Sequence, residues 1–195
     1  MNDSRSKLVL AEAAGDLAEV RKHRKDVDPT IRAAALGAQN RLDGLRTGDL
    51  VQALADPHPS VRCRALELAI ASRTVEIAPH LDDEDDVVVE TAAWALGERG
   101  TDEPETISQL CAVAREHEVS ICREAAVAAL GAIGAPEGLA TILHAMKDRA
   151  PVRRRAVLAL APFADDDATQ ALRAALTDRD RQVRQAAEDL LGSDV

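Results

Sequence analysis

Apolar residues recur along the chain in six similar blocks of nine residues. The blocks are IRAAALGAQ from Ile31, VRCRALELA from Val61, VVETAAWAL from Val88, CREAAVAAL from Cys122, VRRRAVLAL from Val152 and VRQAAEDLL from Val183. Their first place is Val, Ile or Cys, and their fifth place is always Ala. Places one, five and nine lie about one helical turn apart, so they form an apolar stripe on a helix. Because the fifth residue is always small, we expect a neighbouring helix to pass close to it.

A second apolar-periodic segment precedes each block and predicts the first helix of a pair. These leading segments run from about Lys7 to Arg24, Asp49 to Leu54, Val75 to Leu81, Pro104 to Ala114, Pro136 to Met146 and Ala168 to Leu176. The turns within pairs carry Pro57, Pro59 and Pro151, and the returns between pairs are marked by Gly97/Gly100, Gly131/Gly134 and Pro162. One pair cannot bury its apolar face alone, whereas six stacked pairs share a continuous core.

The predicted fold is therefore all-α, an α-solenoid in a single domain over residues 1–195. Its helix pairs are expected at about 7–40, 41–71, 72–100, 101–134, 135–164 and 165–193. Composition supports this class, because Ala and Leu are strong helix formers and the chain has one Trp, one Phe and no Tyr.

The blocks carry a family resemblance. A turn acid, then Val-Arg, then Ala-Ala-x-Ala-Leu-Gly, as in CREAAVAALG from Cys122, resembles the HEAT repeat, specifically the bacterial PBS-lyase HEAT-like type. The resemblance covers about residues 7–192 and implies a superhelix whose second helices line a concave face. Relatives of this kind include scaffolds and adaptors, bilin lyases, a diiron hydroxylase and distant DNA glycosylases. Departures are Val89 in place of Arg, Gln39 at the end of the first block, and the polar residues Glu188 and Asp189 in the last.

The second place of five blocks is Arg, and we call this series the arginine ladder. Its members are Arg32, Arg62, Arg123, Arg153 and Arg184. A row of arginines suits phosphate binding, but each can also pair with a turn acid of its own or the next repeat, such as Asp56 or Asp148. We assign the ladder to the stacking of repeats.

Two features exceed the repeat pattern and are candidate binding residues. Arg154 and Arg155, with Lys147, Arg149 and Arg153, form a basic cluster, which is either a solvated face or a contact for an acidic partner. Trp94 falls off the apolar stripe, where it either anchors an interface or packs over small residues of an adjacent repeat.

Catalytic and metal-binding patterns are weak. The run of five acids from Asp82 to Asp86 is interpreted as a helix cap, because it lacks the spacing and glycine of an EF-hand loop. Cys111, His117 and Cys122 come closest to a ligand set but lack a fourth member. The single His117-Glu118 pair does not match a diiron hydroxylase. We expect no catalytic residues, no metal and no cofactor, although the sequence leaves bilin attachment open.

The net charge of −10 opposes binding to nucleic acid. We expect another protein as the partner, and the basic cluster suits an acidic one. We expect a non-catalytic interaction scaffold that uses its concave face and is monomeric when alone. The alternative is a nucleic-acid-binding or DNA-repair accessory that uses Arg153, Arg154 and Arg155. Three widely spaced cysteines and the absence of a signal-like or long apolar segment predict a cytoplasmic protein that does not bind membranes.

Overall fold

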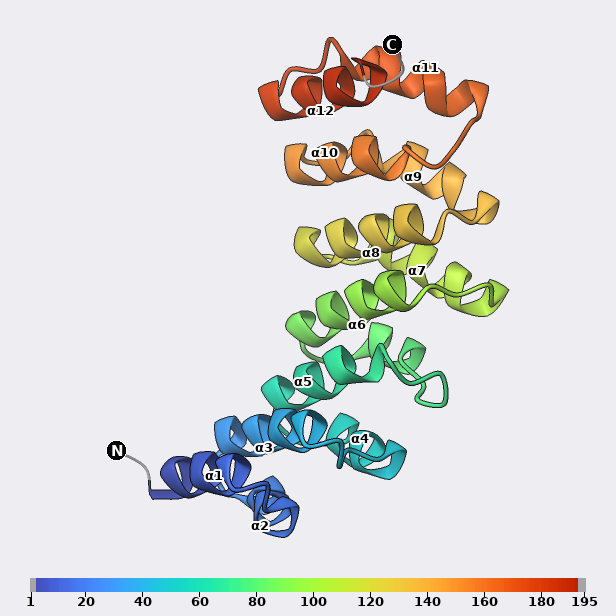
Figure 1. The fold of residues 1–195 in the computed structure, drawn as a ribbon. Helices are drawn as coiled ribbons and strands as arrows, with labels where there is room; N and C mark the ends of the chain where they lie inside the picture. The colour runs from blue at the N-terminus through green and yellow to red at the C-terminus, as the bar shows by residue number, and fades with distance from the viewer. Residues whose placement is uncertain (1–2, 193–195) are drawn as a thin grey trace. The chain divides into compact units, whose positions relative to one another are not determined.

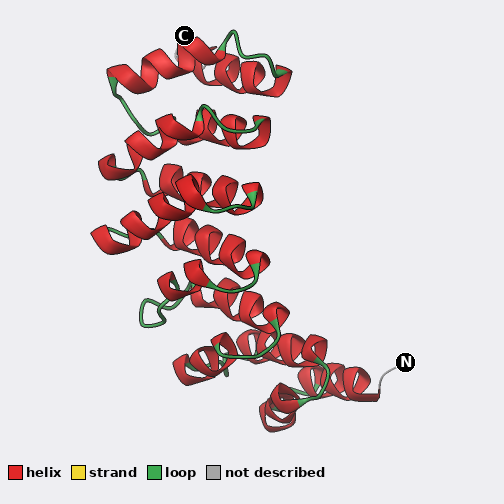
Figure 2. Cartoon of the chain, turned by 180° about the vertical axis from the view of Figure 1, so that it is seen from behind, coloured by secondary structure: helices red, strands yellow, loops and turns green. Residues whose placement is uncertain are grey.

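The computed structural model describes residues 3–192, and these residues form helices and connecting turns without a strand (Figure 2). They divide into two compact units, one ending at Ile77 and the other beginning at Ala78. The prediction of an all-α repeat fold is therefore confirmed. No helix in residues 3–192 combines the length and the apolar character that crossing a membrane requires.

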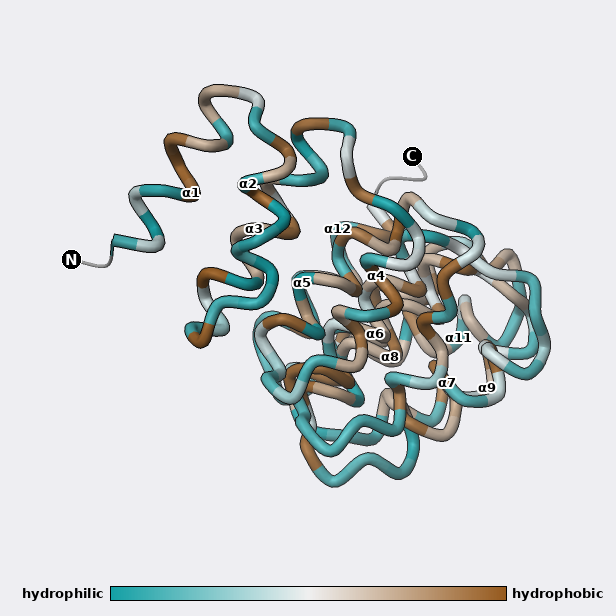
Figure 3. The backbone as a smooth tube through the Cα atoms, turned by 90° about the horizontal axis from the view of Figure 1, so that it is seen from below, coloured by the Kyte–Doolittle hydropathy of each residue, from teal (hydrophilic) through white to brown (hydrophobic). Residues whose placement is uncertain are grey.

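The first unit contains two block helices and their leading helices. In chain order it comprises α1 (Asp3–Ala13), α2 (Leu17–Lys22), the 3-10 helix η1 (His23–Lys25), α3 (Pro29–Arg41), α4 (Thr47–Leu54) and α5 (Pro59–Ala69). The block helices α3 and α5 pack against each other, and α4 packs on α5. Hydrophobic and hydrophilic segments alternate along α1, whose residues Leu8 and Ala11 are buried (Figure 3).

The second unit contains four block helices. It comprises η2 (Ala78–Asp82), α6 (Asp86–Arg99), α7 (Pro104–Glu116), α8 (Ser120–Ile133), η3 (Pro136–Gly138), α9 (Leu139–Ala145), α10 (Ala150–Ala159), α11 (Asp166–Ala175) and α12 (Arg181–Gly192). The block helices α6, α8, α10 and α12 are stacked, and the leading helices α7, α9 and α11 lie beside them (Figure 1).

The apolar stripe of the blocks forms the core of both units. All six fifth-place alanines are fully buried: Ala35, Ala65, Ala92, Ala126, Ala156 and Ala187. The first-place residues are buried with them, from Ile31 to Val183. The periodicity of the sequence therefore identified the buried face of each block helix.

Three leading segments differ from the prediction of one α-helix each, and in the one from Pro136 to Met146 the 3-10 helix η3 precedes α9. The first is divided into α1 and α2, because Gly15 adopts φ +70° and Asp16 begins a new helix by accepting a hydrogen bond from the Glu19 amide. The segment from Val75 to Leu81 contains only η2, because Pro79 opposes a longer α-helix. Val75 and Ile77 are nevertheless buried.

Gly97 and Gly131 were wrongly predicted to lie in the returns between pairs. They lie inside α6 and α8, whereas Gly100 and Gly134 follow these helices with φ +67° and +69°. A Cβ atom on Gly97 would lie 2.9 Å from Ala129 Cα, and one on Gly131 would lie 2.6 Å from Ala159 Cα. These glycines therefore allow successive block helices to approach closely.

Candidate functional site

The arginine ladder joins consecutive repeats through paired hydrogen bonds. Arg123 donates from Nε and Nη2 to the two carboxylate oxygens of Asp148, in the next turn, at 2.7 and 2.9 Å. Its Nη1 donates to His117 O, in its own turn, at 2.7 Å. The guanidinium of Arg123 thus ties its own turn to the next one with a planar, bidentate pair.

The same geometry recurs at two further links. Arg32 pairs with Asp56 at 2.8 and 2.7 Å, and Arg153 pairs with Asp178 at the same two distances. Arg62 and Arg184 contact their own turns, where they donate to Asp56 O and Asp178 O respectively.

The ladder lowers the pKa of its acids. The hydrogen bonds from Arg123 hold the pKa of Asp148 below its ordinary value, and those from Arg153 do the same for Asp178. At Asp56 burial raises the pKa, but hydrogen bonds from Arg32 and the His58 amide outweigh it. These carboxylates are therefore ionised more readily in the folded chain than in the unfolded chain.

The link between α6 and α8 lacks both the arginine and the turn acid of the ladder. Val89 is buried at the place that Arg holds in the other blocks. In the next turn His117 stands where other turns have the acid. Its carbonyl accepts from Arg123, and its Nδ1 accepts from the Val119 amide at 3.2 Å, as Asp56 Oδ1 accepts from the His58 amide. A Val and a His thus replace an Arg and an Asp at the link between α6 and α8.

His117 lies beside two other potential ligands. Among residues 3–192, Asp86, His117 and Cys122 form a group whose ligand atoms all lie within 4.8 Å of one another. Cys111, which sequence analysis placed with His117 and Cys122, does not belong to the group. Asp86 was missed in this role because it is the last of the acids assigned to capping. Burial, followed by the charges of Asp86 and Glu90, raises the pKa of Cys122 to about 11.

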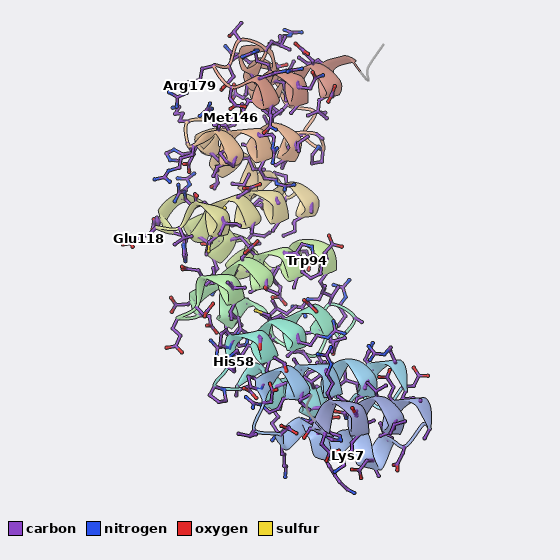
Figure 4. The ribbon with its side chains drawn as sticks, turned by 90° about the vertical axis from the view of Figure 1, so that its left-hand side faces the viewer. Lys7, His58, Trp94, Glu118, Met146 and Arg179 are labelled. Carbon is purple, nitrogen blue, oxygen red and sulfur yellow. The ribbon has the colours of Figure 1, made fainter. Side chains whose placement is uncertain are left out.

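The block-helix face of the second unit carries a shallow apolar groove of about 270 Å³. Its floor is formed by small residues: Gly97 of α6 and Ala125, Ala128, Ala129 and Ala132 of α8. Trp94 and Ile121 stand on its rim, with 45% and 49% of their surface exposed. Figure 4 shows Trp94 on α6, within the stack of block helices. We call this hollow the Trp94 groove.

The apolar surface continues from α8 onto α10. A second hollow shares Ala128, Ala132 and Arg155 with the Trp94 groove and adds Leu158 and Pro162. Leu158 is 42% exposed. The floor was not predicted from the sequence, because alanines away from the stripe resemble ordinary helix-forming residues; their repetition was the available signal.

Charges are distributed unequally along this surface. Glu90 and Glu98 of α6 and Glu124 of α8 line the Trp94 groove together with Arg155 of α10. Arg155 Nη2 lies 3.4 Å from Glu124 Oε1, and its side chain is 40% exposed. The groove is thus acidic near α6 and gains a cation near α10.

The predicted basic cluster is divided among four environments. Arg153 is buried in the ladder, and Arg155 lines the groove. Arg154 donates to Gln182 of α12 at 3.1 Å. Lys147 and Arg149 are exposed in the turn before α10. Arg153 consequently offers little of its surface to an outside partner.

Comparison with known proteins places this geometry in a family. A family model described as HEAT repeats matches residues 47–131 and 122–192, which is more than half of the chain. Two solved structures, an engineered protein from a structural genomics consortium and a designed armadillo repeat protein, are each 18% identical and superpose with a TM-score of 0.62. Each comparison covers 91% of this chain, and 95% and 99% of the respective structures. None of the curated proteins compared matches the sequence.

Proposed function

Because the chain belongs to the HEAT repeat family, a fold typical of protein-interaction modules, we propose that it is a non-catalytic scaffold that binds a protein segment along the Trp94 groove. The exposed apolar rim and alanine floor are the observation that carries this proposal. Exposed apolar surface that forms a continuous hollow is typical of interaction sites, and Trp is enriched among residues that dominate binding energy.

The occupant that fits the groove is a segment with an apolar side chain. The floor residues are small, so the groove can receive a side chain that the segment projects, while Trp94, Ile121 and Leu158 cover its flanks. Burial of these exposed rim residues would provide most of the affinity, because removing apolar surface from water contributes about 25 cal/mol per Å².

Charge would orient the segment. Acidic residues of the partner fit beside Arg154 and Arg155, with Lys147 and Arg149 in the adjacent turn, whereas a basic residue fits beside Glu90 and Glu98. Such a distribution favours one direction of binding, because reversal would place like charges together.

The remaining parts of the proposal concern the state of the protein. We propose a monomer in the absence of its partner and a reducing, cytoplasmic location. Cys63, Cys111 and Cys122 are joined by no disulfide bond, which agrees with that location.

The test begins with affinity capture and then measures the captured partner by calorimetry. The variants W94A and R154E/R155E should each weaken binding at least about tenfold, since central Trp and Arg residues commonly contribute ~2 kcal/mol or more. The effect of R154E/R155E should diminish at high salt, because salt screens exposed charges.

The matched control is R173E/R179E, which makes the same charge change at exposed positions of α11 and the turn after it. Binding by this control should equal that of the wild type. Unchanged affinity of W94A, or an equal loss in the control, would show that the partner binds elsewhere.

A further inference from the structure

The link between α6 and α8 differs from the repeat pattern at several neighbouring places. Val89 replaces the ladder arginine, and His117 replaces the turn acid. Cys122 occupies the first place of its block, where the other five have Val or Ile. Val89 and Cys122 are far apart in the sequence, yet the stacking of α8 on α6 places them at the same link.

The three polar donors at this link have the spacing of a metal site. His117 Nε2 lies 3.7 Å from Asp86 Oδ1, and Cys122 Sγ lies 3.3 Å from Asp86 O. The carboxylate, imidazole and thiol ligand atoms all lie within 4.8 Å of one another. In a tetrahedral zinc site with bonds of about 2.0–2.3 Å, neighbouring ligand atoms are ~3.3–3.8 Å apart. A closure of about 1.5 Å or less would therefore bring all three into range.

The local charge also favours a cation. At the links of Arg32, Arg123 and Arg153 a guanidinium bridges the block helix and the next turn. Val89 supplies no such charge, while Asp86 ends a run of five acids and Glu90 follows on the same helix. A metal ion at this link would occupy the role of the bridging cation.

We propose that Asp86, His117 and Cys122 bind a zinc ion that ties α6 to the start of α8. Oxygen, nitrogen and sulfur donors together suit Zn²⁺ better than Mg²⁺ or Ca²⁺, which prefer oxygen ligands. Asp86 is exposed, so solvent can provide a fourth ligand. This inference does not depend on the proposed groove.

Binding requires two local changes. The thiol of Cys122 loses its proton to solvent as the thiolate coordinates the ion. Coordination through His117 Nε2 places the ring proton on Nδ1, so the hydrogen bond from the Val119 amide is given up.

The experiment titrates the purified metal-free chain with Co²⁺ and then with Zn²⁺. Cobalt reports its ligands, because thiolate coordination gives a charge-transfer band in the near ultraviolet and tetrahedral geometry gives intense visible bands. One equivalent of Co²⁺ should produce both signals, and one equivalent of Zn²⁺ should abolish them. The variants C122V, H117Q and D86N should each weaken binding by more than about a hundredfold, beyond the ~10–100-fold that the loss of a second-shell partner costs.

Suitable controls distinguish this site from adventitious binding. C122V introduces the residue that other blocks carry, so its helical circular dichroism should match the wild type. C111S removes a cysteine outside the group and H80Q removes a histidine that lies 3.7 Å from Asp83, and both should keep the cobalt signal. No thiolate band with excess Co²⁺, or a band that survives in C122V, would overturn the proposal and leave Asp86 and His117 as an ordinary polar contact.

Discussion

Gly131 of α8 lies against Ala159 of α10 so closely that a Cβ atom on the glycine would be 2.6 Å from the alanine Cα. The contact is with backbone, which cannot move aside as a flexible side chain can. The distance between these two block helices is therefore set by the absence of one side chain.

The variant G131A should destabilise the protein by about 1–2 kcal/mol. Overpacking a close contact costs about 1–3 kcal/mol, and Ala recovers up to about 1 kcal/mol through its higher helix propensity. Urea unfolding followed by circular dichroism would measure the change. G48A is the matched control, because a Cβ on Gly48 of α4 meets nothing within 4 Å; a similar loss in both variants would contradict the packing argument.

Acid should destabilise the protein through the ladder. Arg123 lowers the pKa of Asp148 from its usual 3.8, so the folded chain binds fewer protons there than the unfolded chain does. The stability that this pair contributes is present above pH 3.8 and is lost as pH falls through the lowered value. Urea unfolding between pH 7 and pH 3 should show a smaller decline for D148N than for the wild type.

The control for the pH dependence of D148N is the variant D102N, which changes an exposed aspartate in the turn before α7. The free energy of unfolding of D102N should change with pH as that of the wild type does. If D148N and the wild type lose stability in parallel, Arg123 and Asp148 do not stabilise the fold as an ion pair.

The missing link can be restored. V89R and H117D should each be destabilising alone, because one brings a cation to a buried position and the other places two carboxylates together. The double variant should recover a favourable coupling free energy of about 1–3 kcal/mol, the range for charged hydrogen bonds and coupled neighbours. A double-mutant cycle by urea unfolding tests this, and simple additivity of the two losses would refute it.

Duplex DNA should not bind appreciably at physiological salt. The net charge is −10, and Arg153, the central arginine of the basic cluster, is buried against Asp178. Phosphate contacts by Lys and Arg provide most non-specific DNA affinity, so few free cations mean little binding. Fluorescence anisotropy with labelled duplex and single-stranded DNA near 150 mM salt is the measurement, and a sub-micromolar Kd would support a nucleic-acid function instead.

The sequence by itself determined the repeat, the helical class and the buried face. These properties follow from local periodicity: Ala126 and Ala156 recur at the same place in their blocks, and a residue at that place must face the next helix. It also identified arginines and turn acids as partners, because their chemistry and spacing are regular.

Only the tertiary structure decided which residues meet across repeats. Asp86 joins His117 and Cys122 because α8 stacks on α6, a contact that leaves no periodic signal. Gly131 was mistaken for a turn residue because glycine serves both turns and close helix contacts. The Trp94 groove likewise depends on side chains from three helices, and the depth of a surface between helices is fixed by their packing rather than by any one segment.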